Sequence, residues 1–268
     1  MTNLIVSGAC GRMGRAILEV AAVDPAVDVA AAVEAAEHEG TAIPFRDRVL
    51  KVQAGLASGP GVVIEFTSPE ATMDHLPHAV IHGQALVIGT TGLTEAHRRD
   101  LEHAARKIAI VQSTNYSIGV NLLWELSRQA TAAVGDRADI EIIEAHHNRK
   151  QDAPSGTALT IAETIATEQA ARGRAGWGRG DVPPLTHGRL GVTGSRRQAE
   201  IGIHAIRGGD IFGDHTVLFA MDGERLELTH RAHGRQAFAR GAVLAAKWLD
   251  GRKPGLYRMG QVLGLGAA

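Results

Sequence analysis

The stretch "NLIVSGACGRMGRAILEV", Asn3 to Val20, decides the fold. It opens with a short apolar run typical of a strand, passes three glycines, Gly8, Gly11 and Gly14, and continues as a helix. Such glycines allow a tight turn and a close approach of the backbone to a pyrophosphate, and the free N–H groups of the helix start favour an anion. The pattern predicts a dinucleotide-binding unit, although its G-x-x-G-x-x-G spacing is not the usual one. A glycine-rich turn that binds nothing is the alternative.

Outward from this stretch, the first half of the chain alternates short apolar runs with helical patterns. The candidate strands are 3–8, 28–34, 61–67, 84–90 and 108–114, and the candidate helices are about 11–23, 69–82 and 94–107. Continuous apolar runs indicate strands that are covered on both faces. The alternation predicts a Rossmann-type α/β fold with a doubly wound parallel sheet.

From about residue 118 the pattern changes to that of a second, α+β substrate domain with an open mixed sheet. Its candidate helices are 119–134 and 155–171, its candidate strands are 138–147, 200–208 and 215–232, and the Gly/Arg/Pro-rich segment 172–197 is expected to be a long loop. Asp222-Gly223 is a strong hairpin signal within the last strand region. A final helix over 235–251 is expected to pack back on the first domain. We expect a dinucleotide-binding domain at 1–117 completed by 230–268, and a substrate-binding and oligomerisation domain at 118–229.

Composition narrows the class of protein. A net charge of −1 over 268 residues argues against nucleic acid or an anionic membrane as the main partner. No run approaches the roughly 18 apolar residues of a membrane span, and the N-terminus lacks the pattern of a signal peptide. Cys10 is the single cysteine, so no intrachain disulfide can form, and a reducing cytoplasmic setting is expected.

Glu34 stands at the end of the second candidate strand, where an acidic side chain can bind the adenosine ribose hydroxyls of a dinucleotide. Its carboxylate would repel the 2′-phosphate of NADP, and the next residue, Ala35, supplies no guanidinium for that phosphate. Arg46 and Arg48 are the substitutes the sequence offers, at an unknown distance. The sequence therefore favours NADH over NADPH.

Two further segments are predicted at strand ends, where open α/β sheets bind ligands. These are "IGTTGL" (88–93) and "QSTNYSIGVN" (112–121). Their amides and hydroxyls are expected to hold the nicotinamide end of the cofactor. Ordinary turns, which favour the same residue types, are the alternative.

The stretch "EAHHNRKQDAPSGTALTIAE" (144–163) carries the densest chemistry. Adjacent residues of a strand face opposite sides, so His146 and His147 do not form a standard metal-binding pair while the strand continues. A metal held by both histidines and Asp152 stays an alternative with poor spacing, and we expect no metal. Histidine is the natural proton carrier near neutral pH, and Arg149 and Lys150 would attract an acidic substrate. This segment therefore favours acid–base chemistry.

Ser155, Gly156 and Thr157 begin the helix that follows. Hydroxyls and free N–H groups at a helix start are suited to a carboxylate. The alternative is a basic loop before an ordinary capped helix, with Ser155 as its cap. Spacing alone thus predicts a small acidic substrate.

The motifs together resemble one family. "SGACGRMG", "FTSPE", "GTTG", "NYSIGVN", "EAHHNRKQDAPSGTA", "RGGDIFGDHTV" and "GERLELTHRA" resemble the dihydrodipicolinate reductases of bacterial lysine and diaminopimelate synthesis, and the similarity runs to the final "GLYRMGQVLGL". The resemblance implies reduction of 4-hydroxy-tetrahydrodipicolinate, a small dicarboxylate, by NADH or NADPH. It also implies a homotetramer whose domains close on binding.

The resemblance carries roles to individual residues. His146 matches the family's proton donor or acceptor and Lys150 its second catalytic cation. The implied substrate contacts are His147, Gly156 and Thr157, with Arg235 as a further substrate-side arginine. The implied cofactor contacts are Gly8, Ala9, Cys10, Gly11, Arg12, Met13, Glu34, Gly89, Thr90, Thr91, Ser113, Thr114, Asn115 and Tyr116.

The chain departs from the family at two points. Many members carry arginine where Ala35 stands, and the usual Ala-Pro-Asn-Phe-Ser is here Ser-Thr-Asn-Tyr-Ser at 113–117. Three other functions stay open. One is another NAD-dependent dehydrogenase that acts on a small acidic substrate, such as an amino-acid or sugar dehydrogenase. The others are a nicotinamide-sensing binding module and a metal-dependent hydrolase.

Overall fold

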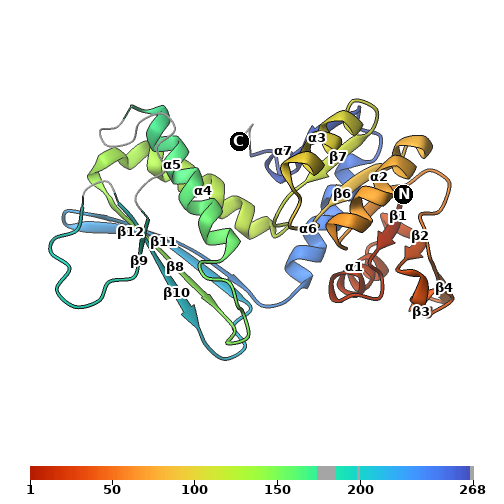
Figure 1. Cartoon of the computed structure of the whole chain (residues 1–268), viewed down its shortest axis with the longest axis horizontal. Helices are drawn as coiled ribbons and strands as arrows, with labels where there is room; N and C mark the ends of the chain where they lie inside the picture. The colour runs from red at the N-terminus through yellow and green to blue at the C-terminus, as the bar shows by residue number, and fades with distance from the viewer. Residues whose placement is uncertain (174–184, 198–199, 266–268) are drawn as a thin grey trace. The chain divides into compact units, whose positions relative to one another are not determined.

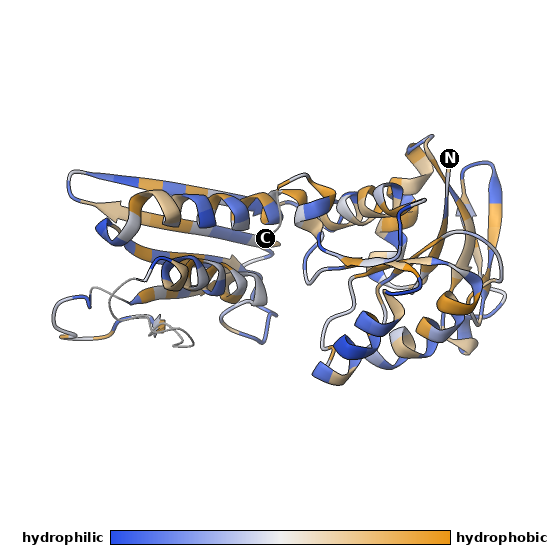
Figure 2. Ribbon diagram, turned by 90° about the horizontal axis from the view of Figure 1, so that it is seen from above, coloured by the Kyte–Doolittle hydropathy of each residue, from blue (hydrophilic) through white to orange (hydrophobic). Residues whose placement is uncertain are grey.

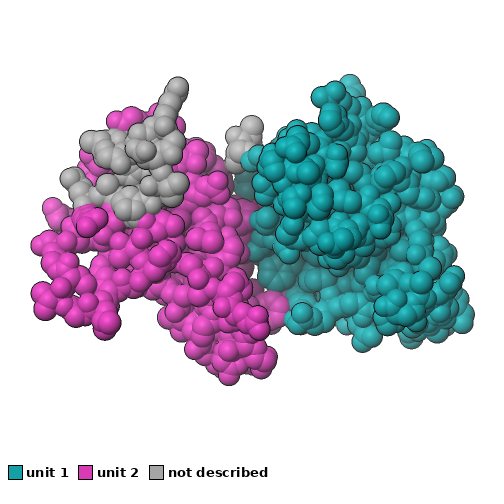
Figure 3. All heavy atoms as spheres, viewed as in Figure 1, with its two compact units in different colours: residues 1–118, 235–268 teal, residues 119–234 magenta. Residues whose placement is uncertain are grey.

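The structure is a computed structural model in which residues 1–173, 185–197 and 200–265 are described. The chain forms two compact units, 1–118 with 235–268 (unit 1) and 119–234 (unit 2), which Figure 3 shows in separate colours. Of the predicted loop 172–197, residues 174–184 lie outside the described residues. None of the described helices has the length and apolar character that a membrane crossing needs.

Unit 1 is built on an eight-stranded sheet with the strand order β13-β7-β6-β5-β1-β2-β4-β3. Every neighbouring pair is parallel except β3 with β4. Its strands are β1 (Thr2–Ser7), β2 (Val27–Val33), β3 (Ala42–Phe45), β4 (Arg48–Gln53), β5 (Val62–Glu65), β6 (Ala85–Ile88), β7 (Ala109–Gln112) and β13 (Gly255–Tyr257). Its helices are α1 (Arg12–Val23), η1 (Ala36–His38), α2 (Pro69–His82), α3 (Glu95–Ala104), α6 (Gln236–Leu249) and α7 (Met259–Val262).

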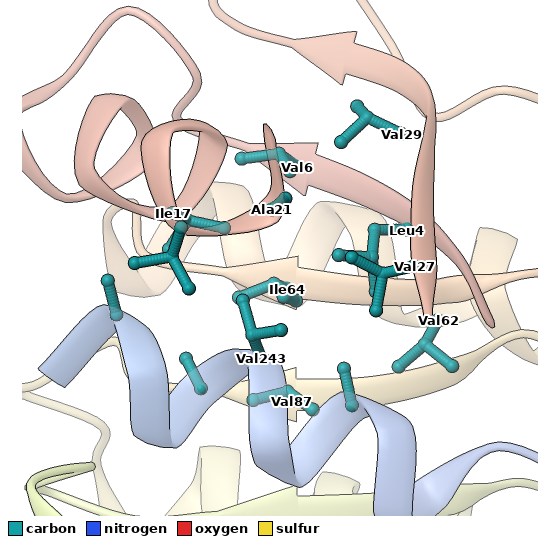
Figure 4. Packing of buried hydrophobic residues seen from close by; sticks show 14 of the residues in the cluster. Leu4, Val6, Ile17, Ala21, Val27, Val29, Val62, Ile64, Val87 and Val243 are labelled. Atoms are coloured by element: carbon teal, nitrogen blue, oxygen red, sulfur yellow. The ribbon is translucent and has the colours of Figure 1, made fainter. Parts of the chain in front are cut away.

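The core of unit 1 lies on both faces of this sheet. On one face, Leu4, Val6 and Ile64 of the strands pack against Ile17 of α1 and Val243 of α6, as Figure 4 shows. On the other face, a second buried cluster joins the strands to α2 and α3. Strands buried on both faces explain the continuous apolar runs of the sequence. The predicted doubly wound parallel sheet is confirmed.

Unit 2 holds a five-stranded mixed sheet with the order β12-β11-β8-β10-β9. Its elements are α4 (Ile118–Val134), η2 (Gly135–Arg137), β8 (Asp139–His146), α5 (Gly156–Ala171), β9 (Leu185–His187), β10 (Ile201–Arg207), β11 (Gly213–Met221) and β12 (Glu224–Ala232). The helices α4 and α5 lie on one side of the sheet (Figure 1), and their apolar and polar residues alternate along the ribbon (Figure 2). The predicted second α+β unit with an open mixed sheet is confirmed.

Local sequence signals explain where several elements begin and turn. Ser68, Thr94 and Ser155 each cap a helix by accepting a hydrogen bond from a backbone N–H one turn in. Gly223, with a φ of 82°, turns the β11–β12 hairpin that Asp222-Gly223 predicts.

Four strands and three short helices go beyond the expected elements. The sequence does not predict β3, β4, β13, η1, η2 or α7, and β9 stands inside the segment expected to be loop throughout. Three-residue strands such as β9 and β13 are too short to show periodicity, and they form only because a longer neighbour pairs with them.

Candidate active site

The cofactor-binding candidates gather at one edge of the large sheet. In the strand order, β1 lies between β5 and β2, so the connections turn to opposite sides of the sheet there. Ligands of doubly wound sheets bind beyond the carboxyl ends of the strands at such a switch point. Gly8 follows β1, Glu34 follows β2 and Gly89 follows β6. Parallel pairing therefore brings three candidates from distant parts of the sequence to the same edge.

The glycine loop has a shape that side chains would destroy. Gly8 has a φ of 76°, and a Cβ placed on it would lie 2.8 Å from the carbonyl oxygen of Phe66. A Cβ on Gly14 would lie 2.1 Å from the carbonyl oxygen of Gly8, because α1 approaches the loop closely. Arg12 begins α1 and is exposed, while Met13 packs against the core. The bare, tight loop before a helix start fits the pyrophosphate of a dinucleotide.

Glu34 lies directly against this loop. Its carboxylate accepts hydrogen bonds from the backbone N–H of Cys10, at 3.1 Å, and of Ala35, at 3.2 Å. Ribose hydroxyls can replace such donors when a dinucleotide binds. A carboxylate that binds the adenosine ribose has to lie next to the glycine loop, and Glu34 lies there.

Arg46 and Arg48 do not lie near Glu34. Arg46 donates hydrogen bonds to the carbonyl oxygens of residues 21, 22, 24 and 27. Arg48 donates to Asp28 and to the carbonyl oxygen of Val29. Both guanidiniums are thus held at the amino end of β2, whereas Glu34 follows its carboxyl end. Neither can serve the site of a 2′-phosphate beside Glu34.

Several residues after β6 and β7 are expected to hold the nicotinamide. Some of them are exposed, and others are hydrogen-bonded within the fold. Thr91 and Thr114 are exposed, and Gly89 and Ser113 are half-buried. Thr90 is buried, and its hydroxyl oxygen accepts from the backbone N–H of Thr67 at 3.3 Å and from the Thr72 hydroxyl at 2.8 Å.

The 113–117 segment is fixed by its own polar groups. The Ser113 hydroxyl donates to the Asn115 carbonyl oxygen, and Asn115 Oδ1 accepts from the backbone N–H of Ser117. Tyr116 is buried, with its hydroxyl 3.0 Å from the carbonyl oxygens of both Ile88 and Val111. A cofactor contact of Tyr116 is therefore restricted to its backbone.

In unit 2, His146 and Ser155 both contact one fully buried carboxylate, Glu144 on β8. Its Oε2 lies 2.7 Å from His146 Nδ1, and both its oxygens accept from the Arg207 guanidinium at 2.8 Å. The backbone N–H of Ser155 donates to Oε1 at 3.0 Å. Burial acts to raise the pKa of Glu144, but the hydrogen bonds from Arg207, His146 and Ser155 outweigh it and lower this pKa. Glu144 is therefore an ionised acceptor at neutral pH.

The negative charge on Glu144 determines which ring nitrogen of His146 carries the hydrogen. A carboxylate only accepts, so His146 Nδ1 carries the hydrogen and Nε2 is left to exchange protons. Nε2 faces Gly213, where an added Cβ would lie only 3.1 Å away. Burial lowers the pKa of His146, and the hydrogen bond to Glu144 opposes this effect. At neutral pH the contact is thus a hydrogen bond from a neutral ring rather than an ion pair.

Lys150 and Ser155 are brought to the same end of β8. Lys150 Nζ lies 2.8 Å from both carboxylate oxygens of Asp152. Arg207 also donates to the carbonyl oxygen of Asp152, at 2.7 Å, so one guanidinium joins this turn to Glu144. A peptide bond in the cis form joins Ala153 to Pro154 just before the helix.

Ser155 caps α5 and is itself supported from β11. Its hydroxyl accepts from the backbone N–H of Ala158 and lies 3.0 Å from His215 Nε2. Burial lowers the pKa of His215 to about 3, so this ring is neutral. Gly156 begins the helix with open space beside it, and Thr157 is half-buried. Ser155 thus has the role of a cap, as in the alternative given above, and anion binding at this helix start stays a prediction.

The two adjacent histidines lie at the end of β8, so the strand alternation expected for them does not extend to His147. β8 ends at His146, and His147 Nδ1 is buried without a hydrogen-bond partner in the described part of the chain. Across the described residues, no group of three or more His, Cys, Asp and Glu side chains is arranged to hold a metal ion. Arg235 precedes α6 and belongs to unit 1, whereas His146, His147 and Lys150 belong to unit 2.

Sequence reasoning missed three residues of this site: Glu144, Arg207 and His215. All three stand inside motifs quoted above, yet charge and spacing gave them no role. Glu144 and His146 share a face because they are two residues apart on one strand, a signal that was present in the sequence. Arg207 and His215 join them only through the pairing of β10 and β11 with β8.

Comparison with known proteins gives two family matches. The model described as "Dihydrodipicolinate reductase, N-terminus" matches residues 2–116, and that described as "Dihydrodipicolinate reductase, C-terminus" matches residues 119–263. Together they span nearly the whole chain.

Curated relatives match at full length. The 4-hydroxy-tetrahydrodipicolinate reductase of Anaeromyxobacter dehalogenans (strain 2CP-C) is 44% identical over 99% of this chain and 98% of its own. That of Desulfovibrio desulfuricans is 46% identical over 96% and 98%. Among solved structures, dipicolinate-bound dihydrodipicolinate reductase from Paenisporosarcina sp. TG-14 shares the fold, with a TM-score of 0.75 at 23% identity over 96% of this chain and 97% of that one.

Proposed function

The chain belongs to the dihydrodipicolinate reductase family, and from this premise we propose that it reduces 4-hydroxy-tetrahydrodipicolinate to tetrahydrodipicolinate with NADH or NADPH. It is an oxidoreductase of amino-acid biosynthesis. The observation that carries the proposed chemistry is the Glu144–His146 pair beside Lys150 and the start of α5. That group combines a proton carrier, a cation and an anion-binding helix start.

The glycine loop and Glu34 are proposed to hold the dinucleotide. Gly8 to Met13 would enclose the pyrophosphate, and Glu34 would accept hydrogen bonds from the adenosine ribose. The nicotinamide end is assigned to Gly89–Thr91 and to Ser113–Tyr116. When bound, the cofactor supplies the hydride that reduces the substrate.

We prefer NADH as the cofactor. The carboxylate of Glu34 would repel a 2′-phosphate, and Ala35 offers no compensating charge. Arg46 and Arg48 support this preference, because their hydrogen bonds hold them at the other end of β2.

The dicarboxylate substrate is proposed to bind Lys150, His147 and the helix start at Ser155, Gly156 and Thr157, with Arg235 as a further contact. Loss of water from the hydroxylated ring gives an unsaturated imine. Hydride addition at the conjugated ring carbon leaves an enamine, which needs a proton. His146 supplies or relays that proton from Nε2, while Lys150 stabilises the developing negative charge.

The lowered pKa of His146 fits this role once the substrate is bound. The free ring is neutral and can take a proton from water. A dianionic substrate beside it raises its pKa, and Glu144 stabilises the resulting imidazolium through Nδ1. The same residue can then act as an acid near neutral pH.

We further propose a cytoplasmic homotetramer assembled through unit 2. None of the described helices of unit 2 covers the sheet face opposite α4 and α5, and Ile143 and Ile206 are exposed there. Exposed apolar side chains on an open sheet face favour association with other copies.

Single-turnover kinetics tests the assignment. His146→Gln and Lys150→Ala are expected to lose most of the hydride-transfer rate while cofactor affinity stays unchanged. His103→Gln and Lys107→Ala, on and after α3, serve as controls. Rates near the wild-type value in both site variants would show that the assignment is wrong.

A further inference from the structure

Unit 1 contains a buried charged group that the proposed chemistry does not use, Glu65 at the end of β5. It is 1% exposed. Its Oε1 accepts from the hydroxyls of Ser7, at 3.0 Å, and of Thr67. Its Oε2 lies 2.8 Å from Nδ1 of His75 on α2. A carboxylate buried this far persists only when it is paired and fully hydrogen-bonded, so His75 and the two hydroxyls form one unit with it.

The hydrogen-bonded group formed by Glu65, His75, Ser7 and Thr67 lies against the predicted cofactor loop. A Cβ on Gly8 would lie 3.2 Å from the methyl group of Thr67, and 2.8 Å from the carbonyl oxygen of Phe66. Ser7 is the last residue of β1, directly before Gly8. The two residues whose hydroxyls bind Glu65 therefore both lie beside Gly8 of the glycine loop.

The same segment also holds the turn after β6. The backbone N–H of Gly89 donates to the carbonyl oxygen of Glu65 at 2.9 Å. The backbone N–H of Thr67 donates to the Thr90 hydroxyl, which also accepts from Thr72 of α2. Glu65 to Thr67 thus connects the two turns that we propose hold the pyrophosphate and the nicotinamide.

We propose that Glu65 and His75 are positioning residues for the nicotinamide cofactor, holding Ser7 and Thr67 so that the Gly8 and Thr90 turns keep their binding geometry. The proposal rests on the proposed cofactor site. Neither residue needs to touch the cofactor. Disturbing the pair should therefore change cofactor affinity more than the rate at saturating cofactor.

The pair should also make the affinity for the cofactor depend on pH. The hydrogen bond to Glu65 raises the pKa of His75 against the opposing effect of burial. α2 packs against α3 and β6, and the charged groups that act on His75 are Glu65 and Asp74. The protonated ring is present below this pKa. As pH rises through it, Glu65 loses its buried counter-charge, and cofactor affinity should fall.

The test measures the Kd for NADH by fluorescence between about pH 6 and pH 9, the range in which histidines titrate. Glu65→Gln and His75→Leu are expected to raise Kd and KM for NADH roughly ten-fold, and to leave kcat at saturating NADH within about two-fold of wild type. His75→Asn places an amide donor near the position of Nδ1. It should retain affinity near the wild-type value at high pH but lose the pH dependence. His82→Asn, exposed on the same helix, is the matched control.

The outcomes separate the two proposals. A wild-type chain that binds neither NADH nor NADPH contradicts the proposed function itself. The positioning role is overturned if the wild-type chain binds NADH and a folded Glu65→Gln or His75→Leu variant binds it with the wild-type Kd. It is also overturned if His75→Asn keeps the pH dependence of wild type, and this outcome decides the question even if Glu65→Gln and His75→Leu do not fold.

Discussion

Replacing Glu144 by glutamine should lower both the stability of unit 2 and the pKa of His146, and the two effects can be measured separately. Four donors point at the Glu144 carboxylate, two from Arg207, one from His146 and one from the backbone of Ser155. An amide oxygen accepts fewer hydrogen bonds, and the amide nitrogen meets donors rather than acceptors. The change keeps the shape of the side chain and removes its charge.

The stability cost follows from the broken ion pair. Removing one partner of a buried pair costs about 3–5 kcal/mol, because the other charge is left uncompensated. Arg207 keeps 20% of its side chain exposed, which places the loss near the lower limit, at about 3 kcal/mol. Urea denaturation of wild type and Glu144→Gln measures this difference directly.

The catalytic effect has a definite sign. Glu144 raises the pKa of His146 against burial, so its loss lowers that pKa further. If kcat needs protonated His146, activity falls as pH rises through this pKa. In Glu144→Gln the fall should occur about one pH unit lower, the equivalent of about 1.4 kcal/mol. The assay is kcat against pH at saturating substrate and cofactor.

Glu125→Gln provides the matched control. Glu125 is also buried in unit 2 and accepts two hydrogen bonds from Arg128, but it lies on α4 and has no contact with His146. Glu125→Gln should lower the free energy of unfolding without shifting the dependence of kcat on pH. An unshifted profile with near wild-type kcat in folded Glu144→Gln would refute the reasoning.

Three further changes probe other parts of the site. Lys150→Met should lower kcat/KM by about 100-fold, since it removes the charge assigned to the developing anion, and a normal value in steady-state assays would contradict this. Ala35→Arg should raise kcat/KM for NADPH relative to NADH by about ten-fold, because a guanidinium next to Glu34 can pair with the 2′-phosphate; an unchanged ratio would place the ribose elsewhere. Ser155→Ala removes the cap of α5 and should lower the free energy of unfolding by about 1 kcal/mol while raising KM for substrate, whereas an unchanged KM would leave Ser155 as a cap alone.

The sequence predicts the large sheet well because its strands are buried on both faces. Continuous apolar runs and the glycines at the first turn both point to the same architecture. The short edge strands β3, β9 and β13 escape prediction. Their pairing depends on a neighbouring strand rather than on their own residues.

The site is predicted less completely than the fold. Sequence spacing places His146, Lys150 and Ser155 near one another, since one strand end and one helix start follow in order. Arg207 and His215 stand about 60 residues further along the chain, and only the registers of β10 and β11 with β8 bring them to Glu144 and Ser155. Burial, which sets the pKa of His146 and His215, cannot be assigned from spacing either.

The proposed reduction is best tested by measuring kcat/KM for NADH and for NADPH with enzymatically generated 4-hydroxy-tetrahydrodipicolinate, followed by the loss of reduced-nicotinamide absorbance. We predict substrate-dependent oxidation of the cofactor, a higher kcat/KM with NADH, and loss of the reaction in His146→Gln. No oxidation of either cofactor by the wild-type chain in the presence of this substrate would contradict the account.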